Sequence, residues 1–98
     1  MEKLEIIWSR RATKNLEEIQ DYIALDDPLA ADAFLDRIEE MVDGLLDYPK
    51  IGRIVPELRN ETFRERIYGH YRIIYRLEPG IIEIITVHHC ARRFPTDI

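Results

Sequence analysis

The sequence predicts an α+β fold in which an N-terminal strand and an antiparallel pair of helices pack on a mainly antiparallel sheet. Three observations carry this prediction: a short apolar segment comes first, two segments with helical spacing of apolar residues follow, and three strand-like segments come last. This order, β-α-α-β-β-β, is typical of a fold with both helices on one face of the sheet. A chain of 98 residues can bury one modest core, so we expect residues 1–98 to form a single domain.

The first strand is expected at residues 4–8, a short run rich in β-branched and aromatic side chains. Ser9 follows and suits a helix N-cap, because its hydroxyl can accept a hydrogen bond from a free backbone amide. A helix is then expected from about residue 10 to residue 25. Its apolar residues recur at intervals of four, three and four and form one buried stripe: Ala12, Leu16, Ile19 and Ile23.

A break at residues 26–28 separates this helix from a second one. Asp27 can cap the amides of the new helix, and Pro28 has the backbone angle that the first helical position requires. Apolar residues then continue at helical spacing from Ala31 to Leu46 with acidic residues between them, so we expect the second helix to run as far as Tyr48. So short a connection makes the two helices antiparallel neighbours.

Prolines and a glycine interrupt residues 49–58, which predicts an extended connector. Three strands are expected after it, at residues 63–68, 70–77 and 81–89, and the last two form a hairpin. A four-residue hairpin loop at residues 77–80 would place an apolar set and a charged set of side chains on opposite faces. The apolar set is Ile73, Tyr75, Ile82 and Ile84, and the charged set is Arg72, Arg76 and Glu83. The register stays open, because a slip of one residue exchanges the faces of one strand.

Charge is divided unevenly along the chain, whose formal net charge is −5 at pH 7. Residues 1–50 carry 13 acidic and 6 basic side chains, whereas residues 51–98 carry 6 acidic and 8 basic ones. Every basic residue after Lys50 is an arginine, the side chain best suited to bidentate contacts with carboxylates or phosphates. The acidic total argues against a general nucleic-acid-binding protein, because such domains are usually strongly basic.

Composition also bears on location and cofactors. No apolar run is long enough to span a bilayer, and residues 1–5 lack the layout of a signal peptide, so we expect a cytoplasmic protein without membrane contacts. Cys90 is the single cysteine and cannot form an internal disulfide, and a zinc site would need several Cys or His ligands at suitable spacing. We therefore expect neither a metal nor a cofactor.

Several segments form a recognisable series when they are taken in order. They are 16–19, 22–23 and 27–28 in the helices, 49–53 and 55–58 in the connector, and 64–66, 71–76 and 87–92 in the sheet, together with Ala12, Ala31, Phe34, Gly69, Ile82 and Ile84. This series, which extends from about residue 5 to residue 93, resembles the ParE/RelE superfamily of toxins from type II toxin–antitoxin systems, and ParE-like toxins in particular. The resemblance implies the same helical hairpin on an antiparallel sheet.

The superfamily holds two activities on one scaffold, so kinship of fold leaves the function open. The resemblance implies either a ParE-type toxin that inhibits DNA gyrase by binding to it, alone or together with DNA, or a RelE-type RNase that cleaves mRNA on the ribosome. In both cases it implies a cognate antitoxin that neutralises the toxin in a hetero-oligomer. A degenerate member whose only role is to form that complex is a third reading.

A RelE-type RNase needs basic groups and an acid–base residue that converge on the scissile phosphate. The candidate positions that the resemblance implies are Arg66, Arg72, His89 and Arg92, with His88 as an alternative to His89. Two features depart from that activity: no lysine follows Lys50, and no tyrosine stands at the C-terminus. We therefore favour the gyrase inhibitor, which requires no catalytic groups.

A gyrase inhibitor requires a surface for its target and another for its antitoxin. The candidates for binding the target or nucleic acid are Arg64, Arg66, Arg72, Arg76, Arg92 and Arg93. The candidates for binding the antitoxin are the apolar connector residues Ile51, Ile54, Val55 and Leu58, which are equally candidates for the core. The sheet edge and the helix grooves suit strand addition and helix docking. The acidic outer faces of the helices either meet a basic surface or are simply solvated.

Overall fold

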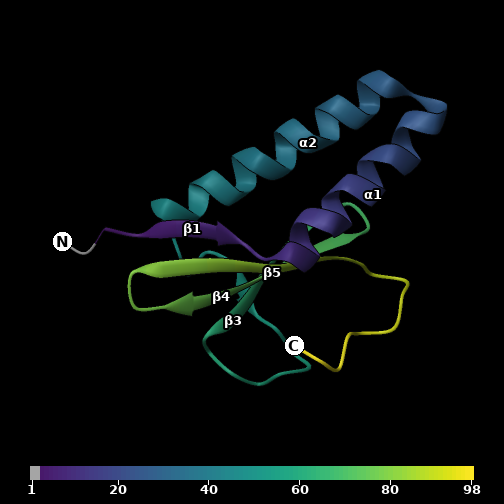
Figure 1. The fold of residues 1–98 in the computed structure, drawn as a ribbon. Helices are drawn as coiled ribbons and strands as arrows, with labels where there is room; N and C mark the ends of the chain where they lie inside the picture. Colours follow the sequence, from purple (N-terminus) through teal and green to yellow (C-terminus); the bar gives the residue numbers. More distant parts are fainter. Residues whose placement is uncertain (1–2) are drawn as a thin grey trace.

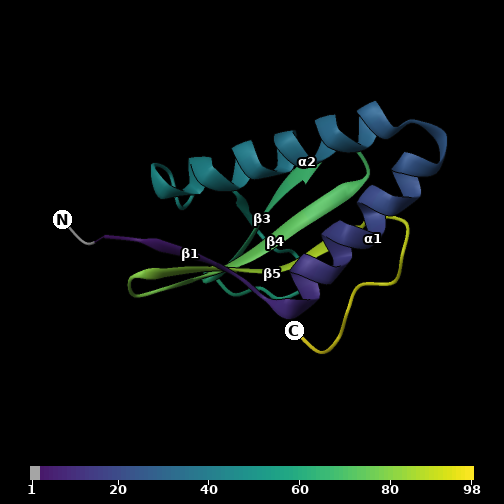
Figure 2. The same ribbon diagram turned by 45° about the horizontal axis from the view of Figure 1, so that its top comes forward.

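A computed structural model describes residues 3–98, and it places two helices on one face of a five-stranded sheet (Figures 1 and 2). Strand β1 (Glu5–Trp8) leads into helices α1 (Arg10–Asp26) and α2 (Pro28–Asp43), and the short 3-10 helix η1 (Gly44–Leu46) follows. The remaining strands are β2 (Arg53–Ile54), β3 (Phe63–Tyr68), β4 (Tyr71–Glu78) and β5 (Ile81–His89). The α+β prediction is confirmed.

The strands lie in the order β1-β5-β4-β3-β2. β1 pairs with β5 in parallel, and every other neighbouring pair is antiparallel, so the sheet is mainly antiparallel as predicted. β2 is an addition that the sequence did not predict: within the extended connector, Arg53 and Ile54 pair with Glu65 and Arg64 of β3. A strand of two residues is too short to leave a periodic pattern in the sequence.

Both helix caps form as the sequence predicts. The Ser9 hydroxyl oxygen accepts a hydrogen bond from the amide of Ala12 (2.9 Å). One carboxylate oxygen of Asp27 accepts from the amides of Leu29 (3.1 Å) and Ala30 (3.2 Å). These bonds satisfy amides that have no partner inside their own helix, and they explain why two helices can follow one another across a single residue.

The second helix ends earlier than predicted, at Asp43 instead of near Tyr48. At Gly44 the chain tightens into η1, and the carbonyl of Gly44 accepts from the amides of both Asp47 (3.2 Å) and Tyr48 (3.1 Å). Glycine is a poor residue for continuing an α-helix, which accounts for the change. The tighter turn still buries Leu45 fully in the core, so the apolar pattern outlasts the α-helix.

The core lies between the two helices and the sheet. Its buried members are Ala12 and Leu16 of α1, Phe34, Ile38, Met41 and Val42 of α2, Leu45 of η1, and Ile73, Tyr75, Ile82, Ile84 and Val87 of the sheet. The side chains of the helices and of the sheet each supply one apolar face, so burial of these faces is what joins the two layers.

The β4–β5 hairpin has a shorter loop than the four residues predicted. Glu78 pairs with Ile81, so the loop holds only Pro79 and Gly80, and Gly80 has the positive φ of 75° that favours glycine after proline in a type II turn. The difference shifts the pairing by two residues, which leaves the faces unchanged. Tyr75 still faces the helices beside Ile84, and the charged set still occupies the opposite face.

The connector is fastened to the sheet by the hydroxyl of Tyr75. This hydroxyl donates to the carbonyl of Pro49 (2.8 Å) and accepts from the amide of Gly52 (3.0 Å), and burial raises the pKa of Tyr75. A Cβ atom at Gly52 would lie 2.6 Å from the carbonyl oxygen of Glu65 and 2.7 Å from the Tyr75 hydroxyl oxygen. Position 52 therefore has no room for a side chain.

We expect Gly52→Ala to lower the free energy of unfolding by about 1–3 kcal/mol, because the added methyl group forces the connector away from the sheet. Gly44→Ala is the matched control, since a Cβ there meets nothing within 4 Å and the backbone is helical (φ −61°). Denaturant titration of both variants measures the effect. Equal stability of the two variants would contradict the close approach at Gly52.

Candidate functional site

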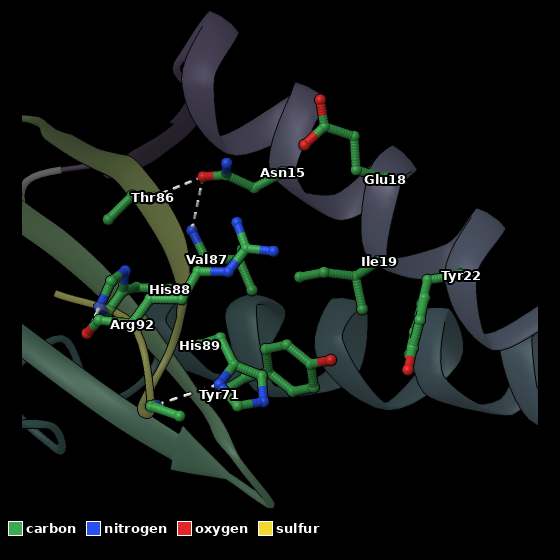
Figure 3. Close-up of a pocket in the computed structure, with 11 residues that line it drawn as sticks. Asn15, Glu18, Ile19, Tyr22, Tyr71, Thr86, Val87, His88, His89 and Arg92 are labelled. Carbon is green, nitrogen blue, oxygen red and sulfur yellow. Dashed lines mark hydrogen bonds between the residues drawn. The ribbon is translucent and has the colours of Figure 1, made fainter.

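An open pocket of about 600 Å³ lies between α1 and the C-terminal end of β5 (Figure 3). Helix α1, strand β4, strand β5 and the segment after β5 all contribute to its lining. The lining residues are Asn15, Glu18, Ile19, Tyr22, Tyr71, Thr86, Val87, His88, His89, Ala91 and Arg92. The helix side thus presents a carboxylate, while the strand side presents imidazole and guanidinium groups.

A bulge in β5 brings α1 against the strand beside this pocket. The pairing of β4 with β5 shifts by one residue between Ile74 and Tyr75, which leaves Ile85 without an opposite residue. The Ser9 hydroxyl, already the cap of α1, donates to the carbonyl of Ile85 (2.7 Å). The helix N-terminus is therefore attached to the strand at the bulge.

Asn15 of α1 makes the second attachment and forms one wall of the pocket (Figure 3). Its side-chain oxygen accepts from the hydroxyl of Thr86 (2.6 Å) and from the backbone amide of Val87 (3.2 Å). Together with the bond from Ser9, these contacts fix the distance between α1 and β5. The wall that α1 and β5 form is thereby a fixed feature of the fold.

The two adjacent histidines point to opposite faces of the sheet, as alternation along a strand requires. His89 lies edge-on to the ring of Tyr71, with centroids 5.1 Å apart, and its Nδ1 accepts from the amide of Ala91 (3.0 Å). The Nε2 of His88 lies 3.1 Å from the carbonyl oxygen of Arg92. His89 therefore faces the pocket together with Tyr71, and His88 helps to hold the segment that follows β5.

Arg72 projects from the face of the sheet opposite the helices into a network of carboxylates. Its Nε donates to the fully buried carboxylate of Glu65 (2.6 Å), and its two terminal nitrogens donate to the carboxylate of Glu57 (2.8 and 2.7 Å). The second oxygen of Glu65 accepts from Nε of Arg53 (2.6 Å). The network joins β2, β3 and β4 to the connector.

The hydrogen bonds from Arg72 hold the pKa of Glu57 at about 2, well below its usual value, and the same contact raises the pKa of Arg72 above its ordinary range. Phe94 covers the remaining side, with its ring centroid 5.1 Å from the guanidinium carbon of Arg72. Each of the three guanidinium nitrogens of Arg72 thus donates to a carboxylate, and the ring of Phe94 lies over the group.

The six arginines predicted to bind the target do not form one basic surface. Arg64 donates to carbonyl groups of the connector and of the loop before β3, and Arg76 pairs with Glu83 (3.0 Å) and with Glu78. Arg72 is engaged as described above. Of these six, Arg66, Arg92 and Arg93 make no hydrogen bond or ion pair through their side chains with the residues that the structure describes.

The four residues considered for RNA cleavage are not brought to one place. Arg66 and His89 lie on the sheet face that carries the helices. Each pairs with a residue of β4 that packs in or against the core: Arg66 with Ile73, and His89 with Tyr71. Arg72 lies on the opposite face. Arg92 stands after β5 at the pocket. The structure therefore brings His89 and Arg92 to one pocket, whose lining includes neither Arg66 nor Arg72.

The connector residues considered for antitoxin binding differ in their exposure to solvent. Val55 is completely buried, so its side chain belongs to the interior and offers no surface to a partner in this conformation. Leu58 is half-buried. Ile51 and Ile54 are 53% and 39% exposed, which leaves these two available for contact.

Glu57 and Glu65 were missed when only the arginines were considered as functional groups. The signal was present in part: Glu65 stands between Arg64 and Arg66 in a strand, so alternation places its carboxylate on the face that Arg72 also occupies. The contribution of Glu57 depends on how the connector folds back, which local sequence does not specify. Asn15 was missed for a similar reason, because its partners are about 70 residues away, beside a bulge.

Within the part of the chain that the structure describes, no group of three or more His, Cys, Asp or Glu side chains is placed to hold a metal ion. No helix among the same residues is both long and apolar enough to cross a membrane.

Residues 6–94 match a sequence family described as the ParE toxin of the type II toxin–antitoxin system parDE. The chain is 35% identical over 89 residues to Toxin RelE2 of Caulobacter vibrioides, and the alignment covers 90% of this chain and 97% of that protein. It is 38% identical over 97 residues to the putative toxin Y4kP of Sinorhizobium fredii, with 97% of each chain covered.

Two solved structures share the fold. One, described as the chromosomal ParDE TA system from P. aeruginosa, superposes with a TM-score of 0.72 at 22% identity and covers 89% of this chain and 96% of that one. The other is the YoeB dimer of Staphylococcus aureus, with a TM-score of 0.60, 17% identity and coverage of 89% and 97%. At these identities the likeness concerns the fold alone.

We expect Glu65→Gln to lower the free energy of unfolding by about 3 kcal/mol, because it leaves two guanidinium groups without their shared buried carboxylate. Glu61→Gln makes the same chemical change at an exposed residue four positions earlier and should change stability by less than about 0.5 kcal/mol. Urea denaturation measures both. A Glu65→Gln variant as stable as Glu61→Gln would show that the network contributes nothing.

Proposed function

Since the chain belongs to the ParE toxin family of type II toxin–antitoxin systems, we propose that it inhibits DNA gyrase by binding and is neutralised by a cognate antitoxin. Such a toxin acts in the cytoplasm, and it requires a surface that recognises the target enzyme, either alone or together with its DNA. It requires no set of catalytic groups.

The engagement of Arg72 is the observation that carries this proposal. For RNA cleavage this guanidinium would have to stabilise extra negative charge on a phosphate. Here it is held by Glu57 and Glu65 and covered by Phe94, on the face opposite His89. A phosphate could reach it only by displacing two carboxylates, one of them fully buried, so the arrangement favours binding over catalysis.

One observation favours the RNase as a second candidate. The pocket gathers His89, Tyr71 and Arg92, which together offer an acid–base group, a ring against which a base can stack, and a cation for phosphate (Figure 3). Glu18 lies on the helix side of the same pocket and would repel a phosphate. We therefore place this candidate second.

The family assigns the protein an antitoxin partner, and we propose where it binds. β2 pairs only with Glu65 and Arg64, so among the described residues the rest of the outer edge of β3 has no strand beside it. Ile67 on that stretch and Ile51 and Ile54 in the connector are exposed. An extended antitoxin segment that added a strand to β3 would cover these apolar groups in a hetero-oligomer.

We expect the purified protein to inhibit supercoiling of relaxed plasmid by DNA gyrase and to increase the amount of cleaved plasmid. Arg66→Ala removes an unpaired guanidinium and should raise the half-inhibitory concentration by about fivefold, as expected for the loss of one charged contact at an interface. Arg10→Ala is the matched control, because Arg10 is an exposed arginine away from the pocket, and it should stay within about twofold of the wild type.

The wild type and a His89→Ala variant test the RNase. Failure of the wild-type protein to inhibit gyrase would reject the proposed activity. If growing cells that express it also accumulate cut mRNA, and His89→Ala abolishes the cuts, the second candidate is correct.

A further inference from the structure

The turn between α1 and α2 projects beyond the ends of the strands (Figures 1 and 2). Three large apolar side chains stand at this end of the helical hairpin: Tyr22 is 73% exposed, Leu25 is 83% exposed and Leu29 is 79% exposed. These values exceed those of every other large apolar residue found exposed within residues 3–98. We refer to Tyr22, Leu25 and Leu29 as the hairpin tip.

The packing of the fold does not account for the hairpin tip. The buried residues of α1 are Ala12 and Leu16, both in its first half, and no residue after them in this helix is buried. Single exposed apolar residues are ordinary on protein surfaces, but three of this size within eight positions are typical of a contact surface. Tyr22 and Leu25 are three residues apart and therefore share a helix face.

The charge around the hairpin tip indicates which kind of partner fits this surface. Residues 15–36 contain seven acidic side chains and no lysine or arginine. Asp21 and Asp32 line a groove between the two helices beside the tip. Such a surface repels the phosphates of a nucleic acid and attracts a protein surface that carries lysine and arginine around an apolar depression.

The hairpin tip is also continuous with the pocket at α1 and β5. Tyr22 lines the outer end of that pocket, with Glu18 one turn before it on the same helix (Figure 3). A partner seated on the tip therefore extends naturally along α1 towards His89 and Arg92. Interfaces with this composition have an apolar centre and a charged rim.

We propose that the hairpin tip is the docking surface for the target protein, and that the matching surface of the target is basic and partly apolar, of the kind with which proteins hold nucleic acid. The inference rests on the proposed function in that it requires a protein target. It adds the surface that the toxin uses. It also implies that the toxin and nucleic acid compete for the same basic groups of the target.

Paired substitutions test the apolar and the acidic parts separately. Leu25→Ser with Leu29→Ser removes exposed apolar surface, and Asp21→Lys with Asp32→Lys reverses the charge beside the tip. Tyr48→Ser and Asp47→Lys are the matched controls, because both residues are exposed and lie outside the hairpin. Circular dichroism melts of all four variants should show folded proteins, as expected for changes at exposed positions.

Two readouts are compared: the amount of toxin that arrests growth of an inducible strain, and the concentration that half-inhibits supercoiling by DNA gyrase. Both tip variants should require at least about tenfold more protein in each assay, as for the loss of a central interface contact. The controls should stay within about twofold of the wild type.

The outcomes separate this inference from the gyrase proposal. Growth arrest that depends on the tip, with no inhibition of gyrase by the wild type, supports the docking surface and rejects gyrase as the target. Undiminished arrest by both tip variants overturns the docking surface. A wild-type protein that does not arrest growth overturns both proposals. The variant with Asp21→Lys and Asp32→Lys is also tested for binding to a labelled DNA duplex. If this variant binds the duplex more tightly than the wild type and also arrests growth more strongly, the occupant of the tip is nucleic acid and the inference is overturned.

Discussion

The carboxylate of Glu65 lies fully buried between the guanidinium groups of Arg53 and Arg72, and the side of the sheet away from the helices is organised around it. An unpaired buried charge costs several kcal/mol, so each of these groups constrains the others. Through Arg72 the constraint reaches Glu57 in the connector and Phe94 after the last strand. The connector, the C-terminal segment and three strands are thereby joined in one network.

This constraint explains why the two sides of the molecule differ in what they offer a partner. On the side of the network, arginines that look free in the sequence are paired with carboxylates, as Arg72 and Arg76 show. On the side of the helices, the apolar tip and the pocket stay open. A toxin that acts by binding can use the open side while the network keeps the scaffold rigid. A nuclease would need the network to open before Arg72 could meet its substrate.

Local patterns in the sequence predicted the parts of the fold that depend on local chemistry. The caps at Ser9 and Asp27, the apolar stripes and the alternation of β4 and β5 each follow from residues close together in the chain. The early end of α2 follows from a local residue, Gly44, which the apolar pattern that continues to Leu46 concealed. The bulge at Ile85 and the pairing of β2 depend on contacts between distant segments, which no local period encodes. For the same reason the sequence predicted that the arginines belong to one functional surface, whereas the structure places Arg66 and Arg72 on opposite faces of the sheet.

A double-mutant cycle between Arg72 and Glu57 tests most directly whether Arg72 is a structural residue held by carboxylates. Arg72→Met, Glu57→Gln and the double variant are unfolded with urea at pH 7 and at pH 2. Because the pKa of Glu57 is lowered to about 2, the contribution of its charge is complete above about pH 4.5 and is lost as the pH falls through 2. We predict a coupling free energy of about 1 kcal/mol or more at pH 7 that shrinks towards zero at the lower pH. No coupling at pH 7 would mean that Arg72 is free to meet a substrate, and would contradict the account.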